Sequence, residues 1–262
     1  MIIEYFAKFS FLKRLISSIG TRGLKILGKN RDYFNINGVY FFLDFLDPID
    51  REIIINKKYE HDQVIFIENE MKKNLFSNFL DIGSNSGYYA FYFANKFKNL
   101  KIMAFEPNVD AFYKLKKTLK KNSFQNIKIF NFGLSNKKKK VHMKSMIKND
   151  FVHSNSSVVD NLRELNDQNF RVFQSFLKVG DDQIQFKNKN LFIKIDVESH
   201  EIFVLKGLIK NLNQNKCLIL IEIGHNKFNQ VNDFLIKNHF SIVFKSKLRS
   251  DYVYSNFNHK MN

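Results

Sequence analysis

Several residue types are scarce in this sequence, and each shortage excludes a class of protein. A single cysteine, Cys217, in a chain of 262 residues rules out a disulfide framework and a cysteine-rich zinc site. Two prolines and ten glycines form no linker between domains. We also expect no secretory signal and no membrane-spanning helix, because no apolar run suits either. Hydrophobic residues make up 44% of the chain, which is enough for a core, so one folded domain is expected.

Acidic residues are also scarce relative to basic ones. The 25 Asp and Glu face 42 Lys and Arg, which gives a formal net charge of +17. Such a surplus is typical of proteins that bind nucleic acid, an anionic membrane or an acidic substrate. Lysine supplies 35 of the basic residues, however, whereas a phosphate-reading surface would favour arginine. Because Asn, Ile and Phe are abundant too, A/T-rich coding explains most of the surplus, and we expect no nucleic-acid partner.

The first sixty residues are expected to form an N-terminal extension. Apolar side chains recur every three or four residues from Ile2 to Ile19, which predicts a basic amphipathic helix. This helix either packs on the domain or lies on an anionic bilayer. Short apolar pieces at 39–43 and 53–55 indicate strands or a small cap, and a helix is expected at 61–75.

Residues 61–262 alternate between strand and helix patterns. Strands are expected at 79–82, 101–105 and 127–132, with helices at 88–97 and from Val109 onward. Short connections and right-handed crossovers make this order half of a doubly wound parallel sheet. Further strands are expected at 191–196, 217–223, 241–245 and 252–255, and helices at 200–211 and 227–238. The predicted fold class is therefore α/β, with a Rossmann-like, mostly parallel sheet of about seven strands.

The alternation is interrupted at about 134–190, which we interpret as an insertion into the domain. A charged turn is expected at 137–140, followed by short strands at 141–143 and 173–179. The polar segment 154–159 is expected to be a loop.

The turn after the first strand of the sheet predicts a cofactor site. Asp81, Gly83 and Gly87 form the pattern D-x-G-x-x-x-G, which is neither the G-x-G-x-x-G of dinucleotide folds nor the G-K-[ST] of a phosphate loop. Glu106 ends the second strand, 19 residues after Gly87, where an acid can accept hydrogen bonds from both hydroxyls of a ribose. A carboxylate at the turn suits a ligand with an ammonium and a sulfonium, so we expect S-adenosylmethionine.

Four segments resemble the FkbM-type methyltransferases of the class I superfamily. Residues 80–89, LDIGSNSGYY, are similar to their motif D-[IV]-G-A-N-x-G-Y-Y. Residues 104–108 and 131–135, AFEPN and NFGLS, resemble the second motif and the segment after the third strand. The most specific segment is 192–207, where FIKIDVESHE is followed by VLKG, similar to I-K-I-D-V-E-G-x-E…V-L-x-G.

This resemblance implies methyl transfer from S-adenosylmethionine, usually to a hydroxyl of a sugar or another biosynthetic intermediate. The turn from Asp81 to Gly87 would hold the amino-acid end of the cofactor, and Glu106 would hold the ribose. The cofactor-binding residues implied by motif position are Asp81, Gly83, Ser84, Asn85, Gly87, Tyr88, Glu106, Pro107, Asn131, Gly133 and Asp196, with Asn131 and Gly133 near the adenine. Ser84 replaces the usual Ala, and Ser199 replaces a Gly, which strains the turn if φ is positive there.

Acids and a histidine cluster where the fourth and fifth strands are expected to end. Asp196, Glu198 and His225 are the candidate catalytic residues, because a hydroxyl acceptor must lose a proton during transfer. A purely structural alternative remains, since Ser199 suits a helix N-cap. A divalent metal on Asp196, Glu198 and Glu222 is the other option, but carboxylates also bind sugar hydroxyls directly, so no metal is assigned.

The sequence therefore predicts a cytoplasmic O-methyltransferase that acts on a sugar of a glycan, glycolipid or related intermediate. The alternatives are an RNA methyltransferase and a non-catalytic binding module that keeps the fold. Twelve lysines between Asp110 and Asp150, with no acid among them, indicate an acidic crevice inside a basic shell. Together with the N-terminal helix, this shell could rest on the anionic inner face of a membrane.

Overall fold

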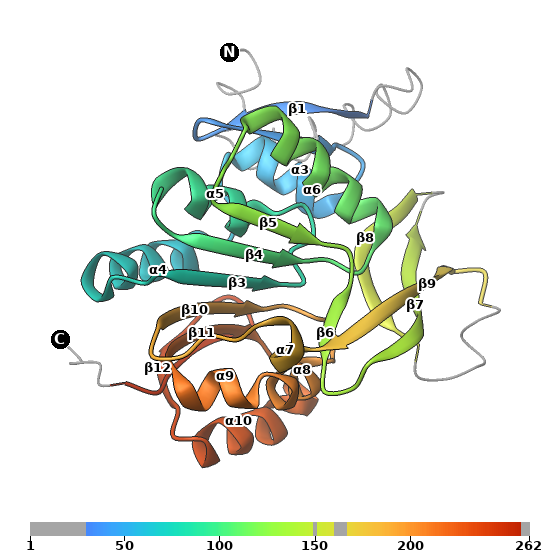
Figure 1. The fold of residues 1–262 in the computed structure, drawn as a ribbon. Helices are drawn as coiled ribbons and strands as arrows, with labels where there is room; N and C mark the ends of the chain where they lie inside the picture. The colour runs from blue at the N-terminus through green and yellow to red at the C-terminus, as the bar shows by residue number, and fades with distance from the viewer. Residues whose placement is uncertain (1–29, 149–150, 160–166, 258–262) are drawn as a thin grey trace.

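The computed structural model describes residues 30–148, 151–159 and 167–257, so the helix expected at 1–20 lies outside the described residues. A seven-stranded sheet of order β12-β13-β11-β10-β3-β4-β5 forms its centre (Figure 1). All neighbours pair in parallel except β13, which is antiparallel to β11 and β12, so the expected mostly parallel sheet is confirmed. The strands are β3 (Asn78–Ile82), β4 (Lys101–Phe105), β5 (Ile127–Phe130), β10 (Asn190–Ile195), β11 (Lys216–Glu222), β12 (Ser241–Lys245) and β13 (Asp251–Ser255).

The strand order places a crevice at one edge of this sheet. The chain leaves β3 toward β4 and β5 on one side, and returns to β10 and β11 on the other. Connections on opposite sides diverge at the carboxyl ends of β3 and β10, where open α/β sheets bind their ligands.

Helices cover both faces of the sheet, because its central strands are apolar on both. Phe79 and Phe192 pack into the core on one face, and Leu80 and Ile193 into the core on the other. The first core receives α3 (Pro48–Asn56), α4 (His61–Asn74), α5 (Tyr88–Lys96) and α6 (Val109–Asn122), and the second α8 (Glu201–Gly207), α9 (Ile209–Gln214) and α10 (Phe228–Lys237).

The segment before α4 packs on the first core. An antiparallel hairpin of β1 (Arg31–Ile36) and β2 (Val39–Asp44) contains the strand expected at 39–43. The strand interpretation of 53–55 is wrong, because these residues lie in α3. Asp47 caps that helix by accepting hydrogen bonds from the N–H groups of Ile49 and Asp50, and Pro48 suits its first turn.

The insertion forms a second, four-stranded sheet of order β6-β9-β7-β8. It stands beside the carboxyl ends of the central strands (Figure 1). The strands expected at 141–143 and 173–179 are found within β7 and β9, whereas the loop expected at 154–159 is wrong because most of it lies in β8. The strands are β6 (Gly133–Ser135), β7 (Lys139–Lys148), β8 (Phe151–Val158) and β9 (Phe170–Val179). The charged turn expected at 137–140 is therefore shorter, because residues 139 and 140 already belong to β7.

Two smaller features complete the fold. The single helix expected at 200–211 is divided into α8 and α9, which meet at Leu208. The backbone of Gly207 lies so close to β6 that a Cβ would stand 2.0 Å from the Ser135 carbonyl oxygen. Short turns of helix at α7 (Gly180–Gln183) and η2 (His225–Lys227) follow β9 and β11. None of the helices in the described part of the chain combines the length and apolarity needed to cross a bilayer.

Candidate active site

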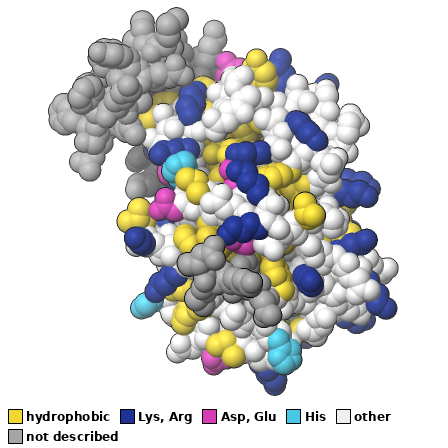
Figure 2. Space-filling view, turned by 90° about the vertical axis from the view of Figure 1, so that its left-hand side faces the viewer, with side chains coloured by type: hydrophobic (Ala, Val, Ile, Leu, Met, Phe, Trp, Pro, Cys, Tyr) yellow, Lys and Arg dark blue, Asp and Glu magenta, His cyan; other side chains and the backbone are white. Residues whose placement is uncertain are grey.

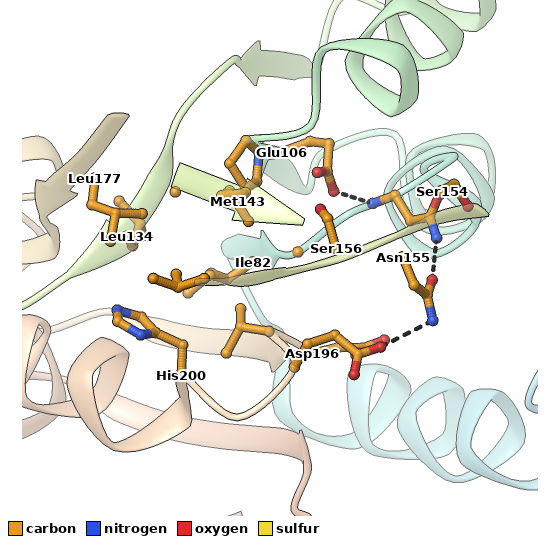
Figure 3. A pocket seen from close by; sticks show the side chains of 17 residues that line it. Ile82, Glu106, Leu134, Met143, Ser154, Asn155, Ser156, Leu177, Asp196 and His200 are labelled. Carbon is orange, nitrogen blue, oxygen red and sulfur yellow. Dashed lines mark hydrogen bonds between the residues drawn. The ribbon is translucent and has the colours of Figure 1, made fainter. Parts of the chain in front are cut away.

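A cavity opens at the carboxyl ends of β3, β4 and β10 (Figure 3). The central sheet forms its floor, and β7, β8 and β9 of the small sheet supply the opposite wall. The lining residues are Ile82, Gly83, Asn85, Glu106, Pro107, Gly133, Leu134, Met143, Ser154, Asn155, Ser156, Val158, Leu177, Asp196, Val197, Glu198 and His200. A second cavity adjoins it and shares Gly83, Asn85 and Asp196, and it also contains Asp81, Tyr88 and Lys194.

Two glycines shape the turn between β3 and α5. Gly83 has φ +79, and a Cβ there would lie 1.8 Å from the Asp196 carbonyl oxygen. Gly87 has φ +81, and a Cβ there would lie 2.3 Å from Leu115 Cδ2 of α6. Only glycine fits either position, because the backbone is left-handed and the neighbour is in contact. The turn therefore passes directly over the end of β10, which accounts for the spacing of the D-x-G-x-x-x-G pattern.

Asp81 is a buried carboxylate at the end of β3. Its Oδ2 accepts a hydrogen bond from the Ala90 N–H of α5 at 3.2 Å, whereas its buried Oδ1 has no donor among the described residues. Burial raises the pKa of Asp81 to about 6, although the nearby Lys194 ammonium opposes the shift. The buried Oδ1 of Asn85, in the same cavity, also has no donor in the described part of the chain. Two unpaired acceptors beside one cavity fit a ligand that brings an ammonium group.

Glu106 lies at the end of β4 and is also buried. Its two oxygens accept hydrogen bonds from the N–H groups of Asn85 at 2.7 Å and Asn108 at 2.8 Å. Burial raises the pKa of Glu106 to about 7, and these two donors only partly offset it. Asn131 does not line the cavity, and its side chain donates to the Glu106 carbonyl oxygen at 2.8 Å. Glu106 thus faces the cavity from a fixed position, as ribose binding requires.

The turn after β10 presents Asp196 and Glu198 to the cavity. Lys194 Nζ lies 2.9 Å from Asp196 Oδ2, and this buried lysine also faces Asp81. Burial, together with the charges of Asp196 and Glu201, raises the pKa of Glu198. Glu198 and Ser199 have φ values of 46° and 74°, so the serine that replaces the family's glycine does adopt a left-handed conformation.

Besides Asn131, the predicted residues His225 and Glu222 stand away from both cavities. His225 is exposed in η2, and neither cavity has it in its wall. Glu222 at the end of β11 does not line them either, although burial and the charges of Asp196 and Asp251 raise its pKa to about 8. Within the described ranges, no group of three or more His, Cys, Asp or Glu is placed to hold a metal. The roles predicted for the other residues remain predictions.

Sequence reasoning missed the wall that the small sheet provides. Met143, Val158 and Leu177 give this wall an apolar part, and Ser154 and Asn155 give it a polar part. Ser154, Asn155 and Ser156 of β8 are consecutive polar residues that line the cavity, and such a polar run resembles a loop in sequence. His200, by contrast, belongs to the motif segment 192–207. Its Nε2 lies 3.0 Å from Ser135 Oγ.

The strand order and this site define a class I, S-adenosylmethionine-dependent methyltransferase. The family model described as the Methyltransferase FkbM domain matches residues 81–246, and the chain belongs to this family. A search of curated protein sequences finds no match.

Solved structures share the fold at low sequence identity. A Staphylococcus aureus protein provisionally named a caffeoyl-CoA O-methyltransferase is 14% identical, with a TM-score of 0.50 over 79% of this chain and 89% of that one. An rRNA methylase from Streptococcus thermophilus is 11% identical, with a TM-score of 0.40 over 69% and 85%. A Streptococcus mutans methyltransferase in complex with SAH, also provisionally named, is 10% identical, with a TM-score of 0.43 over 73% and 95%. The likeness to the Staphylococcus aureus protein supports the fold alone.

Proposed function

We propose that this methyltransferase acts on a hydroxyl oxygen, in a sugar of a glycan, glycolipid or related biosynthetic intermediate. The observation that carries the proposal is the pair of carboxylates, Asp196 and Glu198, on the cavity wall beside the cofactor residues. A hydroxyl must lose its proton during transfer, and a carboxylate within reach can accept it. Carboxylates also accept hydrogen bonds from the other hydroxyls of a sugar ring.

The residues of the two cavities suit the parts of S-adenosylmethionine. The unpaired oxygens of Asp81 and Asn85 would accept hydrogen bonds from the ammonium, and Glu106 would hold the ribose hydroxyls. Met143, Val158 and Leu177 offer an apolar surface for the adenine. When bound, the cofactor would supply a methyl group on a positively charged sulfur. Near that group, the chain's own task is to align the acceptor and exclude water.

The two carboxylates differ in their suitability for proton transfer. Asp196 is fixed in place by an ion pair with the Lys194 ammonium, whose Nζ lies 2.9 Å from its Oδ2. Glu198 has no cationic partner at that distance among the described residues, and burial and two neighbouring acids raise its pKa. A carboxylate with a raised pKa is the better proton acceptor near neutral pH. We therefore assign acceptor orientation to Asp196 and proton removal to Glu198.

The test of the acceptor class is mass spectrometry on candidate glycans and glycolipids incubated with the enzyme and S-adenosylmethionine. A gain of one methyl group on a sugar hydroxyl is the expected result. Methylation of RNA or of a nitrogen atom, with no product from the glycan panel, would overturn the proposal. An RNA acceptor would also show binding that weakens steeply with salt, since phosphate contacts release counterions.

The test of the carboxylates uses Asp196→Asn and Glu198→Gln. Both variants should bind S-adenosylmethionine in calorimetry about as well as the wild type. Turnover on the identified acceptor should fall by about 10²-fold or more, the typical contribution of general acid–base catalysis, at least for Glu198→Gln. Wild-type turnover in both variants would reject the catalytic assignment.

A further inference from the structure

Asn155 of β8 connects the two turns that border the cavity. Its Oδ1 accepts a hydrogen bond from Asn85 Nδ2 at 3.0 Å, and its Nδ2 donates to Glu198 Oε1 at 2.9 Å. Figure 3 shows this pair of bonds as a line across one end of the cavity, from the β3–α5 turn to the β10–α8 turn. We call this arrangement the Asn155 bridge. Asn155 belongs to the small sheet and lies outside the four motif segments described above.

Both turns that the bridge joins contain a left-handed residue. Asn85 has φ 48°, which asparagine adopts readily, and Glu198 has φ 46°. For a residue such as glutamate this conformation costs roughly 1–2 kcal/mol, and it persists only where its surroundings hold it. Asn85 is further fixed by the hydrogen bond from its N–H to Glu106. The turn around Glu198 is closed by a hydrogen bond from the His200 N–H to the Val197 carbonyl at 3.3 Å. Among the described residues, the side chain of Glu198 is held by its hydrogen bond from Asn155.

The bridge lies where the two cavities meet. Gly83, Asn85 and Asp196 line both the cavity that contains Glu106 and the cavity that contains Asp81. One ligand that reaches both carboxylates must therefore pass through this junction. Because Asn85 belongs to the junction and to the bridge, the Asn155 side chain stands next to the middle of such a ligand.

Two helix caps fix the backbone of β8 beside the bridge. The Ser154 N–H donates to Oδ2 of Asp47, the N-cap of α3, at 2.9 Å. The Ser154 carbonyl accepts from Nδ2 of Asn108, the N-cap of α6, at 3.1 Å. The position of Asn155 is thus set by rigid elements, as precise positioning of a ligand requires.

We propose that Asn155 is a positioning residue that closes the junction over the bound cofactor and orients the Glu198 carboxyl. The proposal rests on the cofactor site and on the role of Glu198 given above. In the bound state the bridge must break before the middle of the cofactor can leave. Loss of the bridge should therefore affect release more than capture.

The first test measures dissociation of S-adenosylhomocysteine by stopped-flow displacement, which requires no acceptor. Asn155→Ala should release this product about tenfold faster, with a smaller change in the association rate. Gln174→Ala is the matched control, because Gln174 is an exposed amide on β9 of the same sheet. An unchanged dissociation rate in Asn155→Ala, or an equal change in both variants, would overturn the proposal. Failure of the wild type to bind would instead reject the cofactor site itself.

The second test introduces a charge at position 155. Its pH-dependent effect is expected if Asn155 contacts Glu198, and not if Asn155 has a merely structural role. Asn155→Asp sets a carboxylate against Glu198 at a distance now spanned by a 2.9 Å hydrogen bond. At neutral pH, retention of S-adenosylhomocysteine should be worse than in Asn155→Ala. At a pH low enough to protonate one of the two acids, the bridge should form again, and dissociation should slow relative to Asn155→Ala. Equal behaviour of the two variants across this pH range would contradict the bridge.

Discussion

Burial determines the chemistry of the two carboxylates that we propose bind the cofactor. Asp81 and Glu106 are almost completely enclosed, and burial raises their pKa values to about 6 and about 7. Glu106 already accepts hydrogen bonds from the N–H groups of Asn85 and Asn108, so its charge is only partly compensated before a ligand binds. Hydroxyl and ammonium donors of the cofactor would complete that compensation. Cofactor binding should therefore be linked to proton release.

The affinity for S-adenosylmethionine should fall as the pH is lowered through 7. Below its raised pKa, Glu106 is protonated, and it must lose this proton before the cofactor can bind to its ionised form. The affinity should therefore fall by up to about tenfold for each pH unit below the pKa. Calorimetry across this range checks the slope. Glu106→Gln should bind the cofactor more weakly at alkaline pH, and its affinity should no longer depend on pH near 7. The dependence on pH near 6, which comes from Asp81, should remain. An identical profile in the variant would remove Glu106 from the site.

Ser199 is the residue where this chain departs most visibly from its family. Its φ of 74° is left-handed, a conformation that costs a side chain roughly 1–2 kcal/mol. Ser199→Gly removes this strain and should raise the free energy of unfolding. The gain should be at most about 1 kcal/mol, because the greater freedom of glycine in the unfolded chain offsets part of it. Ser157→Gly, in the extended strand β8, should instead lower it by roughly 0.5–1 kcal/mol. Urea denaturation measures both, and a loss of stability in Ser199→Gly would show that the serine side chain compensates for the strain.

At the scale of elements, a buried ion pair attaches the N-terminal segment to the main domain. Lys114 of α6 lies 2.7 Å from Asp50 of α3 and 3.9 Å from Asp47, and all three side chains are almost fully enclosed. Burial alone would lower the pKa of Lys114, but these carboxylates raise it, so the ammonium stays charged. The β1–β2 hairpin and α3 are therefore held against α6 by charge as well as by apolar packing.

Lys114→Ala should lower the free energy of unfolding by about 3–5 kcal/mol. The substitution leaves the buried carboxylates of Asp47 and Asp50 without their cation, and that cost far exceeds the loss of an exposed pair. Lys116→Ala, an exposed position on the same helix, should change it by less than about 0.5 kcal/mol. Urea denaturation measures both values. Similar small effects at the two positions would mean that the N-terminal segment contributes little to the stability of the domain.

The sequence predicts the central sheet well, and physical reasons explain where it fails. Buried parallel strands such as β3 and β10 are continuous apolar runs bounded by turns, so their pattern is plain. The apolar run 53–55 fits a strand or a helix equally, and only the Asp47 cap decides for the helix. β8 is polar because it faces a cavity, and no periodicity of apolar residues reveals a strand that lines a site.

The same limit applies to the site. Residues within one turn, such as Asp81, Gly83 and Asn85, are predictable because the backbone alone brings them together. Asn155 lies 70 positions from Asn85 and 43 from Glu198, so nothing local indicates that its amide joins them. Such contacts depend on where the small sheet packs, which is a tertiary property.

At the scale of the whole molecule, one face is basic while the site is rich in acids. Figure 2 shows Lys and Arg side chains spread over the face at the amino ends of the parallel strands, with few Asp and Glu among them. The acids Asp81, Glu106, Asp196 and Glu198 instead gather at the opposite edge, around the two cavities. A formal net charge of +17 therefore coexists with an acidic site.

One basic surface also carries exposed aromatic rings. Lys121 of α6 lies over the rings of Tyr33 and Tyr40, at 5.5 and 5.7 Å, and Lys117 lies over Tyr113 at 5.3 Å. Tyr40 and Tyr113 are both 44% exposed. Tyrosine prefers the interfacial layer of a bilayer, and lysine is attracted to anionic lipid, so we propose this surface as the place where the expected membrane contact would lie.

We expect the full chain to bind vesicles of phosphatidylcholine and phosphatidylglycerol, and to leave vesicles of phosphatidylcholine alone unbound. Reversing Lys117 and Lys121 to Glu should weaken co-sedimentation by about tenfold or more, since each lysine near an anionic surface contributes about 1 kcal/mol. Reversing Lys189 and Lys216, exposed lysines at the amino ends of β10 and β11, makes the same charge change elsewhere. Removal of residues 1–20 separates the contribution of the basic N-terminal segment. Equal weakening by both pairs of substitutions would indicate a general effect of net charge. If the wild type does not bind the vesicles, coding bias would explain the lysine surplus.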